Sequence, residues 1–397
     1  MNSNSERPPV PLWLLVSPFV LSFVALMFKS PIVRKAMFLP IVGAVIRITV
    51  IRLSPGDYAT ACALTIQVFK MCDFLVLTDS HLELRPVGQI ALSAGSLPLF
   101  ERAKWAMRLL TSPRLIGWTS EPKNSSIPPR PTETSRIRFA IKQTIYLALH
   151  LLTVNILGIT LKLSPGFLQR GPGLAGSGWG RRSVDALQYY AMVWTWISIS
   201  HRIWVLILLS TGRWMPSDLP PMFASLGNAY TLRRFWGQTH HQMLRRVTTS
   251  HGSFVSEKLL RLPRHGRLSL CIQLYVAFFI SGAIHHWGEY MVMPLNGFNL
   301  QACGSMKFFL LQAVAIHGED IMISVGRRME WSFGLKSTWR RKASKVVGCV
   351  YVWQWFTWCF PIGVDPLVRF GVIENGVQVE IIQEACKFFG KGCNFSA

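Results

Sequence analysis

The sequence contains runs of apolar residues that are long enough to cross a lipid bilayer as helices. Val10–Phe28 is such a run without one charged side chain, and Val346–Val364 is a second. A helix needs about 20 apolar residues to cross the hydrocarbon layer of a bilayer. Other runs of similar length contain a few polar interruptions: Ala36–Val50, Tyr58–Leu77, Phe139–Leu161, Ala186–Ser210, Leu268–Leu295 and Phe308–Val325.

The composition favours the same fold class. Hydrophobic residues make up 50% of the chain and charged residues 15%, which leaves too few polar side chains to cover the surface of a soluble domain. A large soluble protein can bury one apolar helix, but it would not need about eight with so little charge between them. The sequence therefore predicts an all-α fold, a polytopic transmembrane bundle of about eight spans that forms a single domain over residues 1–397.

The net charge of +23 is distributed by position along the chain. Lys and Arg gather in alternate connections, in Asp79–Arg138, Thr211–Arg267 and Gly326–Lys345. Cytoplasmic connections of membrane proteins carry such an excess, whereas a nucleic-acid site would need one basic patch with interleaved aromatic residues. We therefore expect these three segments on the cytoplasmic side, the N-terminus in the lumen, and no nucleic acid as a partner.

Two of the connections differ in kind. Residues Thr119–Thr132 are rich in Pro and Ser and are predicted to form a flexible loop. Residues Thr211–Arg267 are basic but contain apolar and aromatic side chains, which is typical of helices at the membrane interface. Gly171–Gly176 matches the GxGxxG pattern formally, but it joins two apolar helices and is predicted to be a turn rather than a nucleotide site.

His285 lies in an otherwise apolar run, where a polar side chain is costly and usually functional. On a helix Ser281 and Glu289 share its face, because they lie four residues before and after it, whereas His286 is turned away by about 100°. Glu289 is therefore expected to orient or polarise His285. A histidine that merely bonds a neighbouring helix would give the same local sequence.

Two sequence blocks together narrow the choice. The first is Phe235-Trp-Gly-Gln-Thr-His-His-Gln242, in the long basic connection, and the second is Ser281-Gly-Ala-Ile-His285. In this order they resemble the wax synthase-like branch of the membrane-bound O-acyltransferase superfamily, which has a Phe-Trp-Gly-x-x-x-His-Gln block followed by Ser-Gly-x-x-His in the next membrane helix. The chain departs from that pattern at Gln238, Thr239 and His240, where the family usually has an Arg pair and Trp.

The resemblance implies roles for individual residues. His285 is implied as the catalytic base and His241 as the second catalytic residue. The side chains expected to contact substrate are Phe235, Trp236, Gln242, Ser281 and Glu289. The arginines expected to attract the phosphates of coenzyme A are Arg233, Arg234, Arg245 and Arg246, although each could be an ordinary cytoplasmic-side charge.

The implied reaction moves an acyl group from a thioester to an alcohol, and a neutral imidazole can accept the hydroxyl proton at neutral pH. Acetyl-CoA or another acyl-CoA is the expected co-substrate, with no bound cofactor and no metal. The Pro-rich loop and the His-His-Gln variant favour the fungal members that acetylate terpenoid or meroterpenoid hydroxyls in secondary metabolism. Acylation of long-chain fatty alcohols to wax esters is the alternative.

We further expect a multi-pass integral protein of the endoplasmic reticulum, with the bilayer, acyl-CoA and a lipophilic alcohol as its partners. The sequence carries no indication of the oligomeric state.

Two other classes fit less well. A membrane di-iron desaturase needs HxxxH and HxxHH boxes, and neither occurs in the sequence. A proton-coupled transporter would explain His317-Gly-Glu-Asp320 inside an apolar run, but the chain has no detectable internal repeat.

Overall fold

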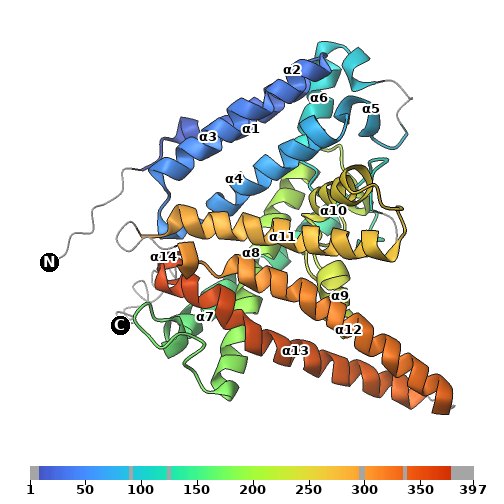
Figure 1. The fold of residues 1–397 in the computed structure, drawn as a ribbon. Helices are drawn as coiled ribbons and strands as arrows, with labels where there is room; N and C mark the ends of the chain where they lie inside the picture. Colours follow the sequence, from blue (N-terminus) through green and yellow to red (C-terminus); the bar gives the residue numbers. More distant parts are fainter. Residues whose placement is uncertain (1–8, 89–92, 123–126, 295–299, 334–337, 377–397) are drawn as a thin grey trace. The chain divides into compact units, whose positions relative to one another are not determined.

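The computed structural model describes residues 9–88, 93–122, 127–294, 300–333 and 338–376. These residues form helices and no strand, and Figure 1 shows their course along the chain. The nearest approach to a sheet in the described part is one isolated bridge between Pro86 and Trp118. The all-α prediction is therefore confirmed.

The chain divides into two compact units. The first contains the residues up to Pro128 together with Phe223–Val352, and the second contains Pro129–Met222 together with the residues from Trp353 onward. Both predicted sequence blocks lie in the first unit. A single domain over the whole chain stays a prediction.

The helices follow the apolar runs and the shorter segments between them. In the first unit they are α1 (Leu12–Met27), α2 (Pro31–Ala36), α3 (Phe38–Ile51), α4 (Tyr58–Met71), α5 (Ser80–Glu83), α6 (Leu99–Leu110), α9 (Leu232–Arg234), α10 (Arg245–Ser253), α11 (Arg267–Val292) and α12 (Ser305–Phe333). The second unit contains α7 (Arg136–Lys162), α8 (Trp179–Ser210) and α14 (Val372–Gly376), while α13 (Thr338–Arg369) runs from the first unit into the second.

Short turns of tighter or wider helix join these elements. The 3₁₀ turns are η1 (Pro55–Asp57), η3 (Ala94–Ser96), η4 (Pro165–Phe167), η5 (Pro216–Asp218), η6 (Leu226–Asn228) and η9 (Leu300–Ala302). The π turns are η2 (Cys72–Leu77), η7 (Phe235–Thr239) and η8 (Phe254–Leu259).

Five helical stretches of the described chain are long and apolar enough to cross a membrane. They are Pro55–Leu77, Arg136–Lys162, Trp179–Ser210, Arg267–Val292 and Ser305–Arg328. Each coincides with an expected span, and the three other expected runs fall in α1, α3 and α13. The helical character of all eight runs is thus confirmed, while the number that cross the bilayer stays a prediction.

The long connection Thr211–Arg267 is helical in its second half, as predicted, through α9, η7, α10 and η8. The described residues of Thr119–Thr132 form no helix, which fits the predicted loop.

In the first unit, α11 packs against α4, α10 and α12. Ile280 and Ile284 of α11 are buried together with Cys62 of α4 and Val247 of α10. A separate apolar core forms where α1 packs against α3 and α6. The helix that carries His285 is therefore fixed on several sides.

In the second unit, α7 packs along α8. The turn at Gly171–Gly176 joins them and binds a carboxylate, because Asp365 accepts the backbone N–H groups of Leu174 at 2.8 Å and Ala175 at 3.1 Å. Gly173 has φ 69°, and a Cβ atom there would lie 2.8 Å from Asp365 Oδ2. Glycine meets both requirements, so the GxGxxG match serves a turn that anchors α13.

A buried ion pair ties α10 to the end of α4. Arg246 donates from Nε to Asp73 Oδ2 at 2.8 Å and from Nη2 to Asp73 Oδ1 at 3.0 Å, and also to Thr78 Oγ1 at 2.8 Å. Asp73 is fully buried. A buried carboxylate needs such a partner, because its transfer from water is otherwise very unfavourable.

We expect Asp73→Asn to destabilise the protein, because losing one member of a buried pair costs about 3–5 kcal/mol. The midpoint of thermal unfolding in detergent should fall clearly. The matched control is Glu101→Gln, which removes the exposed pair of Glu101 with Lys104 and should change stability by about 1 kcal/mol at most. Equal midpoints for the two variants would contradict the structural role of Asp73.

Candidate active site

The first sequence block is anchored to α12. Glu319 accepts the backbone N–H groups of Leu232 at 2.8 Å and Arg233 at 3.1 Å, which occupies the free N–H groups at the start of α9. The Arg233 side chain pairs with Asp320. The acidic residues of the His317-Gly-Glu-Asp320 segment thus hold the block in place, which removes the need to invoke a transport site for them.

A π turn then redirects the chain at the histidine pair. The N–H of His240 donates to the Phe235 carbonyl at 2.7 Å, and His240 leaves the turn with ψ 157°. The Gln242 amide donates to the carbonyls of Trp236 at 3.1 Å and His240 at 2.7 Å. Wide turns of this kind are frequent at functional sites. Here the turn sets the direction in which His240 and His241 leave the helix.

Trp236 packs this turn against both long helices of the motif region. Its ring lies edge-on to Phe278 of α11 at 5.7 Å and beside Phe309 of α12 at 5.8 Å. The Trp236 Nε1–H donates to Gln312 Oε1 at 3.4 Å. The His240 ring is stacked on Phe235, with centroids 5.6 Å apart. The two sequence blocks therefore meet in space.

His285 is held between α4 and α12. Its Nδ1 lies 2.9 Å from the Tyr58 hydroxyl oxygen and 3.7 Å from Cys62 Sγ. Its ring is stacked on Phe309, with centroids 4.9 Å apart and planes 14° apart. His285 as a whole residue is intermediate in burial, and the nitrogen whose contacts are defined is Nδ1, which faces Tyr58 and Cys62.

Two glycines of α11 allow this arrangement. A Cβ atom at Gly288 would lie 2.7 Å from Cys62 Sγ and 3.2 Å from Tyr58 Cε2. A Cβ atom at Gly282 would lie 2.9 Å from Met306 Sδ and 3.3 Å from its Cα. Both separations are shorter than ordinary van der Waals contact, so α4 and α12 approach α11 closely where it carries His285.

His241 lies near His285 and belongs to a mutually repelling set of basic groups. Burial first, and then proximity to His285 and Arg114, lowers the pKa of His241 to about 4. The pKa of His240 is also lowered, by burial first and then by His241 and His285. At neutral pH the His241 ring is thus uncharged. Among the residues that the structure describes, its buried Nδ1 has no hydrogen-bond partner, which suits a group that bonds a ligand.

The other predicted site residues are placed as follows. Phe235 and Gln242 are buried, and Gln242 also accepts from Arg245 at 3.1 Å. The Ser281 hydroxyl donates to the Ala277 carbonyl of its own helix at 3.0 Å. The Glu289 carboxylate accepts from Ser305 rather than orienting His285, from Oγ at 2.6 Å and from the backbone N at 3.3 Å.

The four arginines differ in their surroundings. Arg246 is bound to Asp73, and Arg245 donates to the Gly237 carbonyl as well as to Gln242. Arg233 is exposed in its pair with Asp320, and Arg234 lies over the Tyr230 ring at 4.6 Å. Roles of all these residues in catalysis or binding stay predictions.

Sequence reasoning missed Tyr58, Cys62, Phe309 and Arg114. Tyr58 is separated from His285 by 227 positions, and its place at the start of an apolar run gives no sign of the contact. In the sequence, Phe309 and Cys62 do not differ from the other apolar residues of their helices. A buried arginine, such as Arg114, is unusual enough to be a signal, but its sequence neighbours do not say which histidine it faces.

Comparison with known proteins decides the family. A family described as "Membrane bound O-acyl transferase family" matches residues 219–311, which contain both blocks. Acetyltransferase eriL of Hericium erinaceus is 30% identical over 94% of this chain and 94% of its own length. The chain belongs to the membrane-bound O-acyltransferase family. Acetyltransferase ple2 of Rhodocybe pseudopiperita is 33% identical over 77% of this chain and 76% of its own.

A further relative, O-Mevalon transferase yanI of Aspergillus niger, is 31% identical over 67% of this chain and 62% of its own length. No solved structure gives a significant match to this chain. The protein is therefore an O-acyltransferase and an integral membrane protein, and the resemblance seen in the two blocks is confirmed.

We expect Tyr58→Phe to lower acyl transfer by up to about tenfold, because one hydrogen bond contributes about 0.5–1.5 kcal/mol and 1.36 kcal/mol is a factor of ten. The loss should fall on kcat, since the ring itself remains. Tyr275→Phe is the control, because Tyr275 lies almost three turns before His285 on the same helix α11. An unchanged kcat and pH profile in Tyr58→Phe would show that the contact does not position His285.

Proposed function

We propose that this O-acyltransferase moves an acetyl group from acetyl-CoA to a hydroxyl group of a lipophilic terpenoid or meroterpenoid in secondary metabolism. The observation that carries the proposal is that Trp236 of the first block and His285 of the second both pack on Phe309, in a relative of proteins named acetyltransferases. Other relatives are named O-Mevalon transferases, so the acyl group varies among related chains.

In the proposed mechanism His285 is the base. A phenol oxygen can accept a hydrogen bond, so His285 Nδ1–H is proposed to donate to the Tyr58 oxygen. The lone pair of the ring is then on Nε2, which faces away from Tyr58. Nε2 takes the proton of the incoming hydroxyl while its oxygen bonds to the thioester carbon. The carbon–sulfur bond then breaks, and the proton passes from His285 to the thiolate of coenzyme A.

His241 is proposed to stabilise the negative oxygen of the tetrahedral intermediate. A neutral imidazole has one N–H to donate, and one such donor contributes about 3 kcal/mol in well-studied enzymes. The lowered pKa of His241 keeps the ring neutral, so it does not place a second positive charge beside His285 as that base becomes protonated. Phe309 and Trp236 supply apolar surface that limits the access of water to the thioester.

Arg233, Arg234 and Arg245 are proposed to bind the phosphates of coenzyme A. Arg233 and Arg234 lie at the start of the block, with Arg245 beside it, whereas Arg246 is proposed to act through the fold because Asp73 holds it. We place the protein as a multi-pass protein of the endoplasmic reticulum with this end of the site toward the cytoplasm, where acetyl-CoA is found. No cofactor is required by the chemistry, and the other partners are the bilayer and the alcohol.

The decisive experiment supplies membranes that contain the protein with acetyl-CoA or palmitoyl-CoA and a panel of terpenoid and fatty alcohols. Mass spectrometry then identifies the ester formed. An acetylated terpenoid would support the proposal. A palmitoylated fatty alcohol would identify a wax ester synthase, and no ester beyond that of membranes lacking the protein would remove the proposal.

In this assay we expect His285→Ala to lower transfer by about 10²–10⁴-fold, the usual contribution of a general base. The protein should still reach the membrane, because His285 is only partly buried. His286→Ala is the matched control, since its ring is turned by about 100° and it should reduce transfer much less per folded molecule. Equal activity of His285→Ala and the wild type would remove the assignment of the base.

The charge of the cytoplasmic end gives a separate prediction. Replacing Arg233 and Arg234 together by Ala should raise the KM for acetyl-CoA by about fivefold, or ~1 kcal/mol, with little change in kcat. Added salt should reduce the difference from wild type. Arg138→Ala, an exposed charge at the start of α7, is the control. An equal KM in all three proteins would contradict the role of these arginines.

A further inference from the structure

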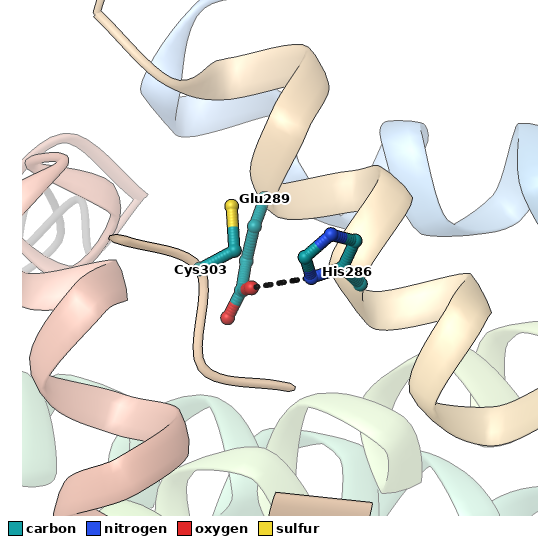
Figure 2. Close-up of side chains that lie close together, drawn as sticks. All are labelled: His286, Glu289 and Cys303. Carbon is teal, nitrogen blue, oxygen red and sulfur yellow. Dashed lines mark ion pairs between the residues drawn. The ribbon is translucent and has the colours of Figure 1, made fainter. Parts of the chain in front are cut away.

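Three side chains at the end of α11 form a group that the acyl-transfer chemistry does not use. His286 and Glu289 lie one turn apart on α11, and Cys303 lies just before α12. Their ligand atoms are all within 4.8 Å of one another. Figure 2 shows the three side chains converging from the helix and from the neighbouring segment.

Within the group, Glu289 accepts from the Cys303 thiol, and it also accepts from the Gly304 N–H, whereas His286 stands outside these hydrogen bonds. His286 Nδ1 lies 3.9 Å from Glu289 Oε2, which is too long for a hydrogen bond. This nitrogen is buried and has no hydrogen-bond partner in the described part of the chain. The Glu289 side chain is fully buried, and Cys303 is buried and not part of a disulfide. A buried nitrogen, carboxylate and thiol that face one another are typical ligands of a metal ion.

We propose that His286, Glu289 and Cys303 bind a zinc ion, with a water molecule as the fourth ligand. Zinc accepts nitrogen at about 2.0–2.1 Å, oxygen at about 2.0–2.2 Å and sulfur at about 2.3 Å. In a tetrahedral site these lengths place neighbouring ligands about 3.3–3.7 Å apart. The separation of 3.9 Å between His286 Nδ1 and Glu289 Oε2 needs only a small rotation of the side chains to reach that range.

The charges of the ligands suit the surroundings. On binding, the Cys303 thiol loses its proton to the solvent, as zinc ligands do. One thiolate, one carboxylate and one neutral imidazole then balance the two positive charges of the ion. A neutral assembly is favoured in a buried place, where an uncompensated charge is very unfavourable.

Ser305 serves as the support of the carboxylate. Its hydroxyl donates to Glu289 Oε1 at 2.6 Å and its backbone N–H donates to Oε2 at 3.3 Å. The Gly304 N–H and the Cys303 thiol are the other donors to Glu289. An ionised carboxylate has about four lone-pair sites, and the one that accepts from the Cys303 thiol becomes available to the metal when that thiol loses its proton. Partners of this kind orient metal ligands and strengthen binding.

The consequence would be a clip between α11 and α12, which carry His285 and Phe309. The zinc ion takes no part in acyl transfer, so the proposal is compatible with a reaction that needs no metal. It does differ from the sequence-based expectation that the protein binds no metal. The inference is independent of the proposed substrate.

The test measures metal in the full-length protein purified in detergent without chelator, incubated with zinc chloride and desalted. We expect about one zinc per chain. Removing a ligand in His286→Ala or Cys303→Ala should weaken binding by at least about 10–100-fold, the loss seen even for supporting residues. Replacing zinc by Co²⁺ should give a thiolate-to-cobalt absorption band that Cys303→Ala abolishes.

Two matched controls should keep the metal: His285→Ala, which changes the adjacent histidine, and Cys359→Ala, which removes a buried thiol of the second unit. Ser305→Ala keeps all three ligands and should bind about tenfold more weakly, which tests the site without removing a ligand. Wild type without zinc above the level of Cys303→Ala, or a cobalt spectrum without a thiolate band, would overturn the proposal. Because metal is measured rather than ester, failure here leaves the acyltransferase assignment unaffected.

Discussion

Polar groups inside apolar helices must be satisfied within the protein, because a bilayer offers them no water. In the described part of this chain the partners come from distant parts of the sequence. Asp73 on the π turn after α4 is bound by Arg246 of α10, and Glu319 of α12 binds the start of α9. The same requirement brings Tyr58 to His285. The site is thus built from contacts that also hold the helices together.

The two histidines of the proposed reaction differ in a useful way. His285 has one nitrogen in contact with Tyr58 and its ring face on Phe309, so its orientation is defined. His241 follows a π turn, and its Nδ1 has no hydrogen-bond partner among the described residues. The His285 ring is therefore held in one orientation, whereas His241 has a ring nitrogen that could bond a reactant. This division suits a base and an electrostatic partner.

Much of the fold and the family followed from the sequence, because apolar length and a pair of short motifs are local properties. The positions of the helices and the family agree with the expectations. The expected partner of His285 was wrong. Helical periodicity predicted Glu289, but the Glu289 carboxylate accepts from Ser305.

Periodicity identifies residues that share a face, but it does not say which neighbouring helix meets that face. The same limit applies to arginines: Arg246 looks like its neighbour Arg245 in the sequence, yet a carboxylate 173 positions away holds it. Contacts over such separations depend on how the helices pack, and the local pattern of a single sequence does not predict that packing.

The attachment of the first block to α12 has a mechanical consequence. Gln312 and Glu319 are seven residues apart, almost two turns, so they lie on one side of the helix and together receive Trp236 and the start of α9. The segment from Leu232 to Trp236 is thus attached to α12 at two points on one side of that helix. Inserting or deleting one residue between Gln312 and Glu319 would rotate one of them by about 100° about the helix axis relative to the other. The segment that leads to His240 and His241 could then no longer bind both side chains.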